Sequence, residues 1–120
     1  DHERDAAMSR SLSLTRHCLG LDTRIECLVL PLAGDTGLWT LICAAGMSGA
    51  QPSAIRAQGP FYGPLMAEGV LAGIADSLQL MGYEPCTDVP IWRLHIQAEL
   101  RRLNGERGRS LGCFQFKPDL

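Results

Sequence analysis

Two segments in the first half of the chain alternate apolar and polar side chains with the two-residue period of a half-buried β-strand. They are RIECLVL, residues 24–30, and LWTLICA, residues 38–44, and the PLAGDTG segment between them supplies the glycine and aspartate that favour a turn. We therefore expect an antiparallel hairpin. One face of this hairpin carries the apolar side chains, namely Ile25, Cys27, Val29, Trp39, Leu41 and Cys43. The other face carries Arg24, Glu26 and Thr40, so the pattern predicts a sheet with one covered face.

The segment from residue 64 to residue 81 has the period of a helix instead. Its apolar side chains recur at spacings of three and four residues, at Ala67, Val70, Leu71, Ile74, Leu78 and Met81. Pro64 is typical of a first helical turn and Gly82 of a helix end. Gly69 and Gly73 lie inside this helix, where each costs about 1 kcal/mol relative to alanine. We expect close packing to offset that cost, either against the sheet or against a second copy of the chain. Both glycines are therefore candidate dimer contacts.

Residues 88–104 fit two kinds of element. Apolar and polar residues alternate from residue 92 to residue 101, as in a half-buried strand. A helix would instead gather four large apolar side chains on one face, namely Trp92, Ile96, Leu100 and Leu103. We favour the helix, which Asn104 and Gly105 could end. On that helix Leu94 lies off the apolar stripe and faces away from the core, so it is a third candidate dimer contact.

The two ends of the chain predict one further element each. Residues 3–18 carry apolar side chains at a loose helical spacing, and Gly20 could end this helix. The LGCFQFK segment, residues 111–117, predicts a last strand beside the hairpin. Together the elements give an α+β fold, in which a small antiparallel sheet of about three strands packs with about three helices on one side. We expect a single domain over residues 1–120, with a mobile helical segment over residues 1–20.

The charge of the chain indicates which kinds of partner it can bind. A net charge of −2 argues against a general nucleic-acid-binding domain, which would usually be basic overall. Residues 93–109 are nevertheless rich in arginine, with Arg93, Arg101, Arg102, Arg107 and Arg109. Glu99 and Glu106 balance part of this charge, and such a run is usually a solvated helix face. A docking patch for an acidic partner is the alternative.

The five cysteines show no CxxC or other paired spacing. The sequence contains neither a signal peptide nor an apolar run long enough to span a membrane, so we expect reduced thiols in a cytoplasmic protein. Cys18 directly follows His17, which is the one hint of a metal site or of a Cys/His catalytic pair. Neighbouring side chains point in different directions, and His95 lies far along the chain. We therefore expect no metal site and no cofactor.

Ser48 lies in the GMSGA segment, where the second predicted strand ends. A nucleophile elbow needs a serine between glycines after a parallel strand and at the start of a helix. Here the strand belongs to a hairpin, Pro52 precedes any helix, and His95 is the only histidine downstream. We therefore do not expect an enzyme, although a small enzyme that uses Ser48 or a Cys/His pair remains an alternative.

The loop over residues 45–63 is rich in glycine and proline but also carries large apolar side chains. Such side chains either fold back as a lid over the core or form the anchors of a protein interface. Five residues of this loop and of the helix start are candidate partner contacts: Met47, Ile55, Phe61, Tyr62 and Leu65. Because Phe61 and Tyr62 are adjacent, they cannot both face one narrow core, and we expect at least one to be exposed.

The chain from LICAAGMSGAQPSAIRAQGPFYGPLMAEGVLAGIADSLQLMGYEPCTDVPIW onward, with its small size and many arginines, resembles the QslA-like quorum-sensing antiactivators of pseudomonads. The resemblance covers most of the chain and rests on no short motif, so it assigns no functional residue. It implies a dimeric α/β protein that binds the ligand-binding domain of LasR, a transcription activator of the LuxR type. Binding would prevent that activator from dimerising and from binding DNA, with no direct contact to nucleic acid or membrane. The alternatives are the small enzyme and a nucleic-acid-binding module that uses the arginine patch.

Overall fold

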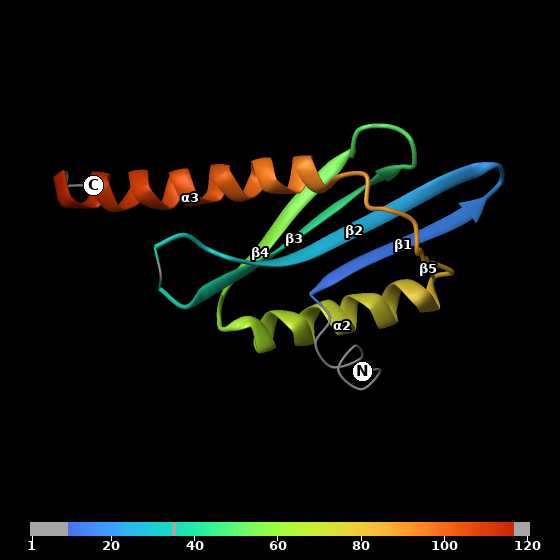
Figure 1. Ribbon diagram of the computed structural model, residues 1–120, viewed down its shortest axis with the longest axis horizontal. Coiled ribbons are helices and arrows are strands. Elements are labelled where there is room, and N and C mark those ends of the chain that lie inside the picture. Colours follow the sequence, from blue (N-terminus) through green and yellow to red (C-terminus); the bar gives the residue numbers. More distant parts are fainter. Residues whose placement is uncertain (1–9, 35, 117–120) are drawn as a thin grey trace.

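The computed structural model describes residues 10–34 and 36–116, which form a five-stranded antiparallel sheet and two helices (Figure 1). The strand order in the sheet is β4-β3-β2-β1-β5. The strands are β1 (Ser11–Cys18), β2 (Leu21–Pro31), β3 (Leu38–Met47), β4 (Ala54–Tyr62) and β5 (Glu84–Pro85). The helices are α2 (Pro64–Leu80) and α3 (Arg93–Phe116). Neither of these two helices is both long enough and apolar enough to cross a membrane.

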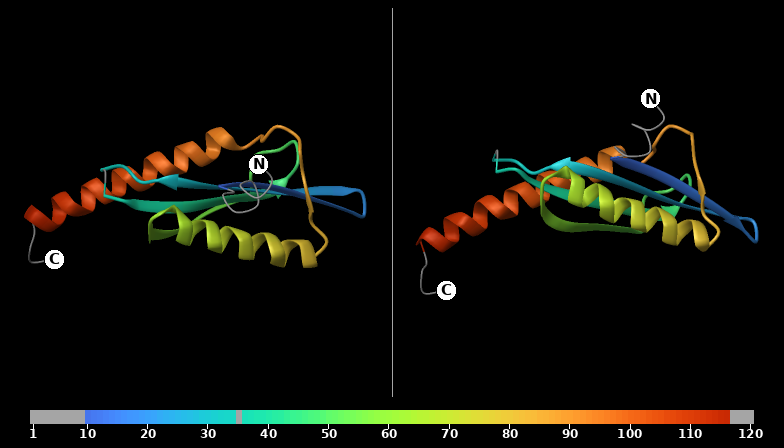
Figure 2. Two further views of the ribbon diagram at one scale, coloured as in Figure 1. Left: turned by 60° about the horizontal axis from the view of Figure 1, so that its bottom comes forward. Right: turned by 90° about the horizontal axis from the view of Figure 1, so that it is seen from below.

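The two helices cover opposite faces of the sheet (Figure 2). The buried cluster under α2 comprises Cys27, Val29, Leu41, Ala67 and Leu71. The buried cluster under α3 comprises Ile42, Ala44, Trp92 and Ile96. The sheet is therefore the middle of three layers.

The fold class expected from the sequence is wrong. The described residues form a sheet of five strands with two helices, whereas we expected about three strands with about three helices on one side. The physical reason lies in β3, which is apolar on both faces. Leu41 and Cys43 pack in the cluster under α2, whereas Ile42 and Ala44 pack under α3. A helix can therefore bury apolar surface on each side of the sheet.

The central hairpin of the sequence analysis is confirmed. Strands β2 and β3 pair antiparallel, with Cys27 opposite Cys43 and Val29 opposite Leu41. These four side chains lie on the face under α2, as the alternating pattern predicts.

The helix expected over residues 3–18 is wrong in the part that the structure describes, because residues 11–18 form β1. Strand β1 pairs with β2 on one side and with β5 on the other. Leu12 and Leu14 are separated by one serine, which is the period of a strand, and Leu14 is fully buried. The remainder of the helical segment expected over residues 1–20 lies partly in residues 1–9, outside the described residues.

The loop expected over residues 45–63 contains the edge strand β4, which pairs with β3. The register of this pairing shifts between Trp39 and Leu41. Gly59 lies at the irregularity with a φ of 120°, a conformation that favours glycine. Pro60 is tolerated next to it because an edge strand does not need every N–H for the ladder. The glycine and proline content therefore marks a bulged edge strand instead of a loop.

The helix favoured over residues 88–104 is confirmed as α3 from Arg93 onward; residues 88–92 are not helical, and the helix continues to Phe116. The strand expected over residues 111–117 is wrong, because residues 111–116 are helical; residue 117 lies outside the described residues. Figure 1 shows the C-terminal part of α3 extending beyond the sheet.

Local contacts explain why α3 does not end at Asn104. The Asn104 Oδ1 accepts a hydrogen bond from the backbone N–H of Ala33 at 2.9 Å, so this side chain holds the helix to the β2–β3 turn. Arg102 forms ion pairs with Glu99 and Glu106, one turn before and one turn after it. These contacts bridge the Asn-Gly pair that suggested a helix end.

Candidate functional site

The solvent-facing side of α2 carries almost no charge. Leu65 is 68% exposed near its start and Leu80 is 90% exposed at its end. We define the α2 outer face as the exposed residues of this helix, namely Leu65, Met66, Gly69, Ala72, Gly73, Asp76, Ser77, Gln79 and Leu80. Asp76 is the one charged residue among the exposed positions of this helix. Because a surface helix usually presents several charged side chains to solvent, the composition of this face is unusual for a solvated helix.

The two glycines of the α2 outer face make no close contact with the described fold. A Cβ atom at Gly69 or at Gly73 would have no neighbouring atom within 4 Å. Close packing against the sheet, one of the two reasons expected for these glycines, is therefore wrong. Their cost in helix propensity, about 1 kcal/mol each, has no compensation within the described residues.

The inward side of α2 fixes the direction in which the outer face points. Ala67 and Leu71 are buried against β2 and β3. Glu68 is also buried, and its Oε2 lies 2.6 Å from the Nε of Arg10. The Arg10 guanidinium in turn lies over the Trp39 ring, 4.9 Å from its centre. This ion pair and the apolar contacts hold the helix against the sheet along one side only.

The structure separates the five candidate partner contacts. Leu65 lies on the α2 outer face, whereas Phe61 packs against the cluster under α2 and Ile55 against the cluster under α3. Tyr62 is 82% exposed, so one of the two adjacent aromatic side chains is exposed, as expected. Met47 is partly exposed at the end of β3. Phe61 and Ile55 therefore serve the core of the protein.

The structure also separates the three candidate dimer contacts. Gly69 and Gly73 lie one turn apart on α2, whereas Leu94 lies on α3, on the other side of the sheet (Figure 2). Leu94 is 82% exposed, and Val89 and Ile91 just before it are exposed as well. We call these last three residues the α3 N-terminal patch. The two surfaces face away from each other, so one contact cannot use both.

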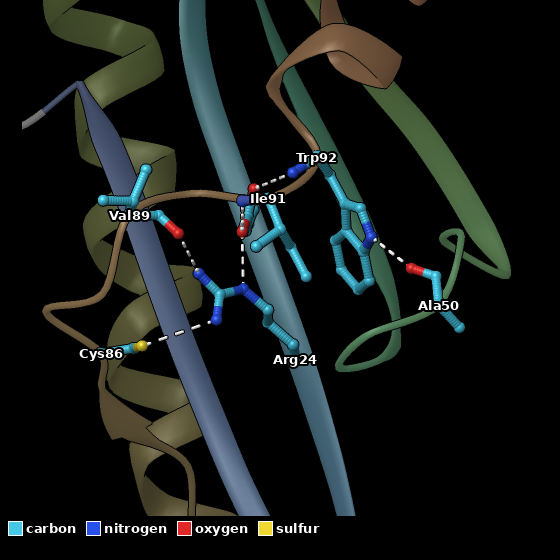
Figure 3. A network of polar contacts seen from close by, with 7 residues as sticks. Arg24, Ala50, Cys86, Val89, Ile91 and Trp92 are labelled. Carbon is cyan, nitrogen blue, oxygen red and sulfur yellow. Dashed lines mark hydrogen bonds and ion pairs between the residues drawn. The ribbon is translucent and has the colours of Figure 1, made fainter.

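A buried ion pair that the sequence analysis missed positions α3 (Figure 3). Arg24 and Glu26, on the face of β2 under α3, are almost fully buried, with the Arg24 Nε 2.6 Å from the Glu26 Oε2. The Glu26 carboxylate also accepts hydrogen bonds from the backbone N–H groups of Ile91 at 2.8 Å and Trp92 at 3.0 Å. A carboxylate at this point pairs with the N–H groups of the two residues that precede α3 and interacts favourably with the helix dipole.

Further hydrogen bonds hold the segment between β5 and α3 to the sheet. The Arg24 guanidinium donates to the Val89 carbonyl at 3.2 Å and to the Cys86 Sγ at 3.7 Å. The Trp92 Nε1 donates to the Ala50 carbonyl at 2.8 Å (Figure 3). The sequence signal for this network was a pair of opposite charges two residues apart, on one face of a predicted strand.

Ser48 lies in the turn between β3 and β4, so it does not occupy the strand-to-helix turn of a nucleophile elbow. It lines a pocket of about 270 Å³ together with His17 and Asp22, whose side chains pair with each other. His95, the histidine considered for Ser48 in the sequence analysis, lines a different pocket beside Trp92. Ser48 therefore shares its pocket with His17, which precedes it in the sequence, and not with His95, which follows it.

The other residues considered for metal binding, catalysis or binding of an acidic partner do not form a site together. His17 and Cys18 are neighbours on β1 and therefore point to opposite faces of the sheet. Within residues 10–34 and 36–116, no group of three His, Cys, Asp or Glu side chains is placed to hold a metal ion. In the arginine patch, Arg93 and Arg101 are exposed and Arg102 is paired with glutamates. The side chains of Arg107 and Arg109 lie outside the described residues.

Comparison with known proteins gives one family. A family model with the description PA4575-like protein matches residues 8–120, which is nearly the whole chain. No curated protein and no solved structure matches the chain.

Proposed function

This chain belongs to the PA4575-like family, and on that premise we propose that it is a non-catalytic cytoplasmic regulator that binds another protein through the α2 outer face. One observation carries the proposal: Gly69 and Gly73 lie exposed in the middle of a helix and no contact in the described fold offsets their cost. Exposed leucines lie on the same face at both ends of the helix. A partner that packs closely over the glycines would supply the missing compensation.

The size of the side chains along the α2 outer face supports a close approach. The middle of this face consists of small residues, namely Gly69, Ala72 and Gly73. A large leucine side chain is exposed at each end, Leu65 and Leu80. A backbone can approach two glycines more closely than any other pair of residues, and the flanking leucines can then enter apolar pockets of the partner. Such a contact buries apolar area with a single charge, Asp76, so moderate salt should affect it little.

The resemblance to the QslA-like antiactivators suggests the partner, namely the ligand-binding domain of a LuxR-type transcription activator such as LasR. The mechanism is occlusion. The α2 outer face would compete with the activator's own dimer interface, so that binding to this protein and activator dimerisation exclude each other. A monomeric activator would then lose its affinity for DNA, and no chemical step would be required.

Replacing either glycine of the α2 outer face by leucine tests the proposal. Gly69→Leu and Gly73→Leu should stabilise the free protein by about 0.5–1 kcal/mol each, because leucine is a better helix former. The same variants should weaken binding to the purified ligand-binding domain about thirtyfold or more, because the added side chains prevent close approach. Calorimetry measures the binding, and chemical denaturation measures the stability.

Ala98→Leu is the matched control, because Ala98 is an exposed position on α3 and receives comparable bulk. This variant should bind normally. If both glycine variants bind as tightly as the unmodified protein, the α2 outer face is not the contact. If the unmodified protein does not bind the activator domain at all, the partner is wrong.

The pocket beside Ser48 is the observation that favours a second candidate function, a small hydrolase. In that pocket Asp22 could orient the His17 imidazole toward a substrate, because the two side chains are paired. Ser48→Ala separates the two candidates. A regulator that acts by contact should keep its full effect in a reporter of activator-dependent transcription, whereas a hydrolase should lose it while remaining folded.

A further inference from the structure

Two cysteines lie directly opposite each other on the central strands, Cys27 on β2 and Cys43 on β3. Both belong to the apolar cluster under α2, Cys27 at its buried centre and Cys43 partly buried beside it. Both thiols are free in the structure. The directly opposed pair is the feature from which the further inference follows.

The hydrogen bonds at the two ends of the β2–β3 ladder fix the kind of pair that the cysteines form. The Leu32 N–H donates to the Leu38 carbonyl, and the Ser48 N–H donates to the Asp22 carbonyl, both at 2.9 Å. In an antiparallel ladder, hydrogen-bonded and non-hydrogen-bonded pairs alternate. Even-numbered residues of β2 therefore form the hydrogen-bonded pairs, and Cys27 with Cys43 is a non-hydrogen-bonded pair.

This position is compatible with a disulfide bond. Opposed Cα atoms are about 4.5 Å apart in a non-hydrogen-bonded pair, where the side chains approach each other most closely. Disulfides span Cα separations of roughly 4.4–6.8 Å. The two sulfur atoms can therefore bond without a change in the pairing of the strands.

The two thiols also differ in their surroundings. A hydrogen bond from the Cys27 thiol lowers the pKa of Cys43, and the same bond, together with burial, raises the pKa of Cys27. Cys43 is partly buried, whereas Cys27 is almost fully buried. Cys43 is thus the more accessible and more acidic thiol, and Cys27 is the buried neighbour that can react with it second.

We propose that Cys27 and Cys43 form an oxidation site at which a hydroperoxide converts two thiols into one intramolecular disulfide. The Cys43 thiolate attacks the peroxide, the O–O bond breaks, and the product is a sulfenic acid on Cys43 with release of water or an alcohol. The Cys27 sulfur then attacks the Cys43 sulfur, the S–O bond breaks, and the hydroxyl leaves with the Cys27 proton as water. In total, two thiols and one hydroperoxide give a disulfide, one alcohol or water, and one further water.

The test uses the full chain with Cys18, Cys86 and Cys113 replaced by serine, so that the proposed pair is the only source of thiols. The reduced protein is treated with a small excess of hydrogen peroxide, alkylated and analysed by peptide mass mapping. We expect a cross-link between the peptides that contain Cys27 and Cys43, complete loss of alkylation at both, and recovery of both thiols with dithiothreitol. Mapping of the unmodified chain gives the same answer if the serine variants fail to fold.

Single substitutions in the same background test the order of the two steps. With Cys27→Ala, the sulfenic acid on Cys43 should persist and be captured by dimedone. In the Cys43→Ala variant, Cys27 should be oxidised about tenfold more slowly than Cys43 is in the Cys27→Ala variant, because Cys27 is buried and its thiol is less acidic. Two thiols that remain alkylatable under conditions that oxidise free cysteine would overturn the proposal. A disulfide that links two chains, seen on a non-reducing gel, would also overturn it.

Discussion

Phe61 and Tyr62 are neighbours at the end of β4, yet their surroundings are opposite. Phe61 packs against the apolar cluster under α2, whereas Tyr62 is 82% exposed. The cause is the geometry of a strand, in which successive side chains point to opposite faces. One substitution therefore affects folding and the other affects the surface, although the two residues are adjacent.

Alanine at these two positions should have different effects on stability. Phe61→Ala removes a ring from the core and should lower the free energy of unfolding by about 2 kcal/mol or more. Tyr62→Ala should change stability by less than about 0.5 kcal/mol, because the side chain is mostly in solvent. Because Tyr62 points to the face of the sheet opposite α2, its loss should leave binding through the α2 outer face unchanged. A large loss of activator binding in the Tyr62 variant would place the contact on the other side of the sheet.

At the scale of elements, α3 is attached to the sheet through a buried charge pair and not through apolar contacts alone. Glu26 accepts hydrogen bonds from two backbone N–H groups at the start of the helix, and Arg24 neutralises its charge. A buried pair of this kind adds little net stability over an apolar pair of equal size. Its partners are nevertheless interdependent, since removal of one leaves the other charged and buried.

Glu26→Gln should therefore destabilise the protein by about 3 kcal/mol or more, since it leaves the buried Arg24 cation without a counter-charge. Arg24→Met combined with Glu26→Gln should recover part of this loss, because glutamine keeps an oxygen acceptor for one of the two N–H groups just before α3. Chemical denaturation measures both effects.

The exposed acid Glu84 supplies the control for this cycle, and Glu84→Gln should change stability by less than about 0.5 kcal/mol. Equal losses in the single and double variants would show that the hydrogen bonds to α3, and not the uncompensated charge, carry the effect. Hydrogen exchange at Ile91 and Trp92 should accelerate in the Glu26 variant, as these amides lose a charged acceptor.

At the scale of the whole molecule, a sheet between two helices leaves two apolar surfaces that face in opposite directions. The α2 outer face lies on one side, and the α3 N-terminal patch of Val89, Ile91 and Leu94 lies on the other. One chain could therefore contact a partner on the first surface and a second copy of itself on the second. This division replaces the earlier grouping of Leu94 with the glycines of α2.

We expect the protein to sediment as a dimer at concentrations on the order of micromolar. Leu94→Arg should convert the dimer to a monomer, because it places a charge in the apolar patch, and it should leave activator binding intact. Analytical ultracentrifugation measures the first effect and calorimetry the second. Asp76→Arg on α2 is the matched control and should leave the dimer unchanged. A monomer of the unmodified chain would remove the case for self-association.

Elements with a strong local period could be predicted from the sequence. The hairpin of β2 and β3 and the helix α2 follow from alternation and from the recurrence of apolar residues, and both are confirmed. Strand β1 was also visible in the alternation of Leu12 and Leu14, but the longer helical interpretation of residues 3–18 obscured it. The bulged strand β4 was hidden because Gly59 and Pro60 are typical of loops as well as of sheet edges.

The candidate site shows the same limit. The sequence by itself determined that Leu65, Gly69 and Gly73 share one face of a helix, because their spacing fixes their angular positions. Only the tertiary structure decided that this face is exposed, that Leu94 belongs to another surface, and that Arg24 and Glu26 are buried together. Period is a local property of the chain, whereas burial depends on which distant segment covers a surface. Ile42 and Ala44 make residues 41–45 a continuous apolar run, which indicates burial on both faces of β3, but only the tertiary structure shows that α3 covers the second face.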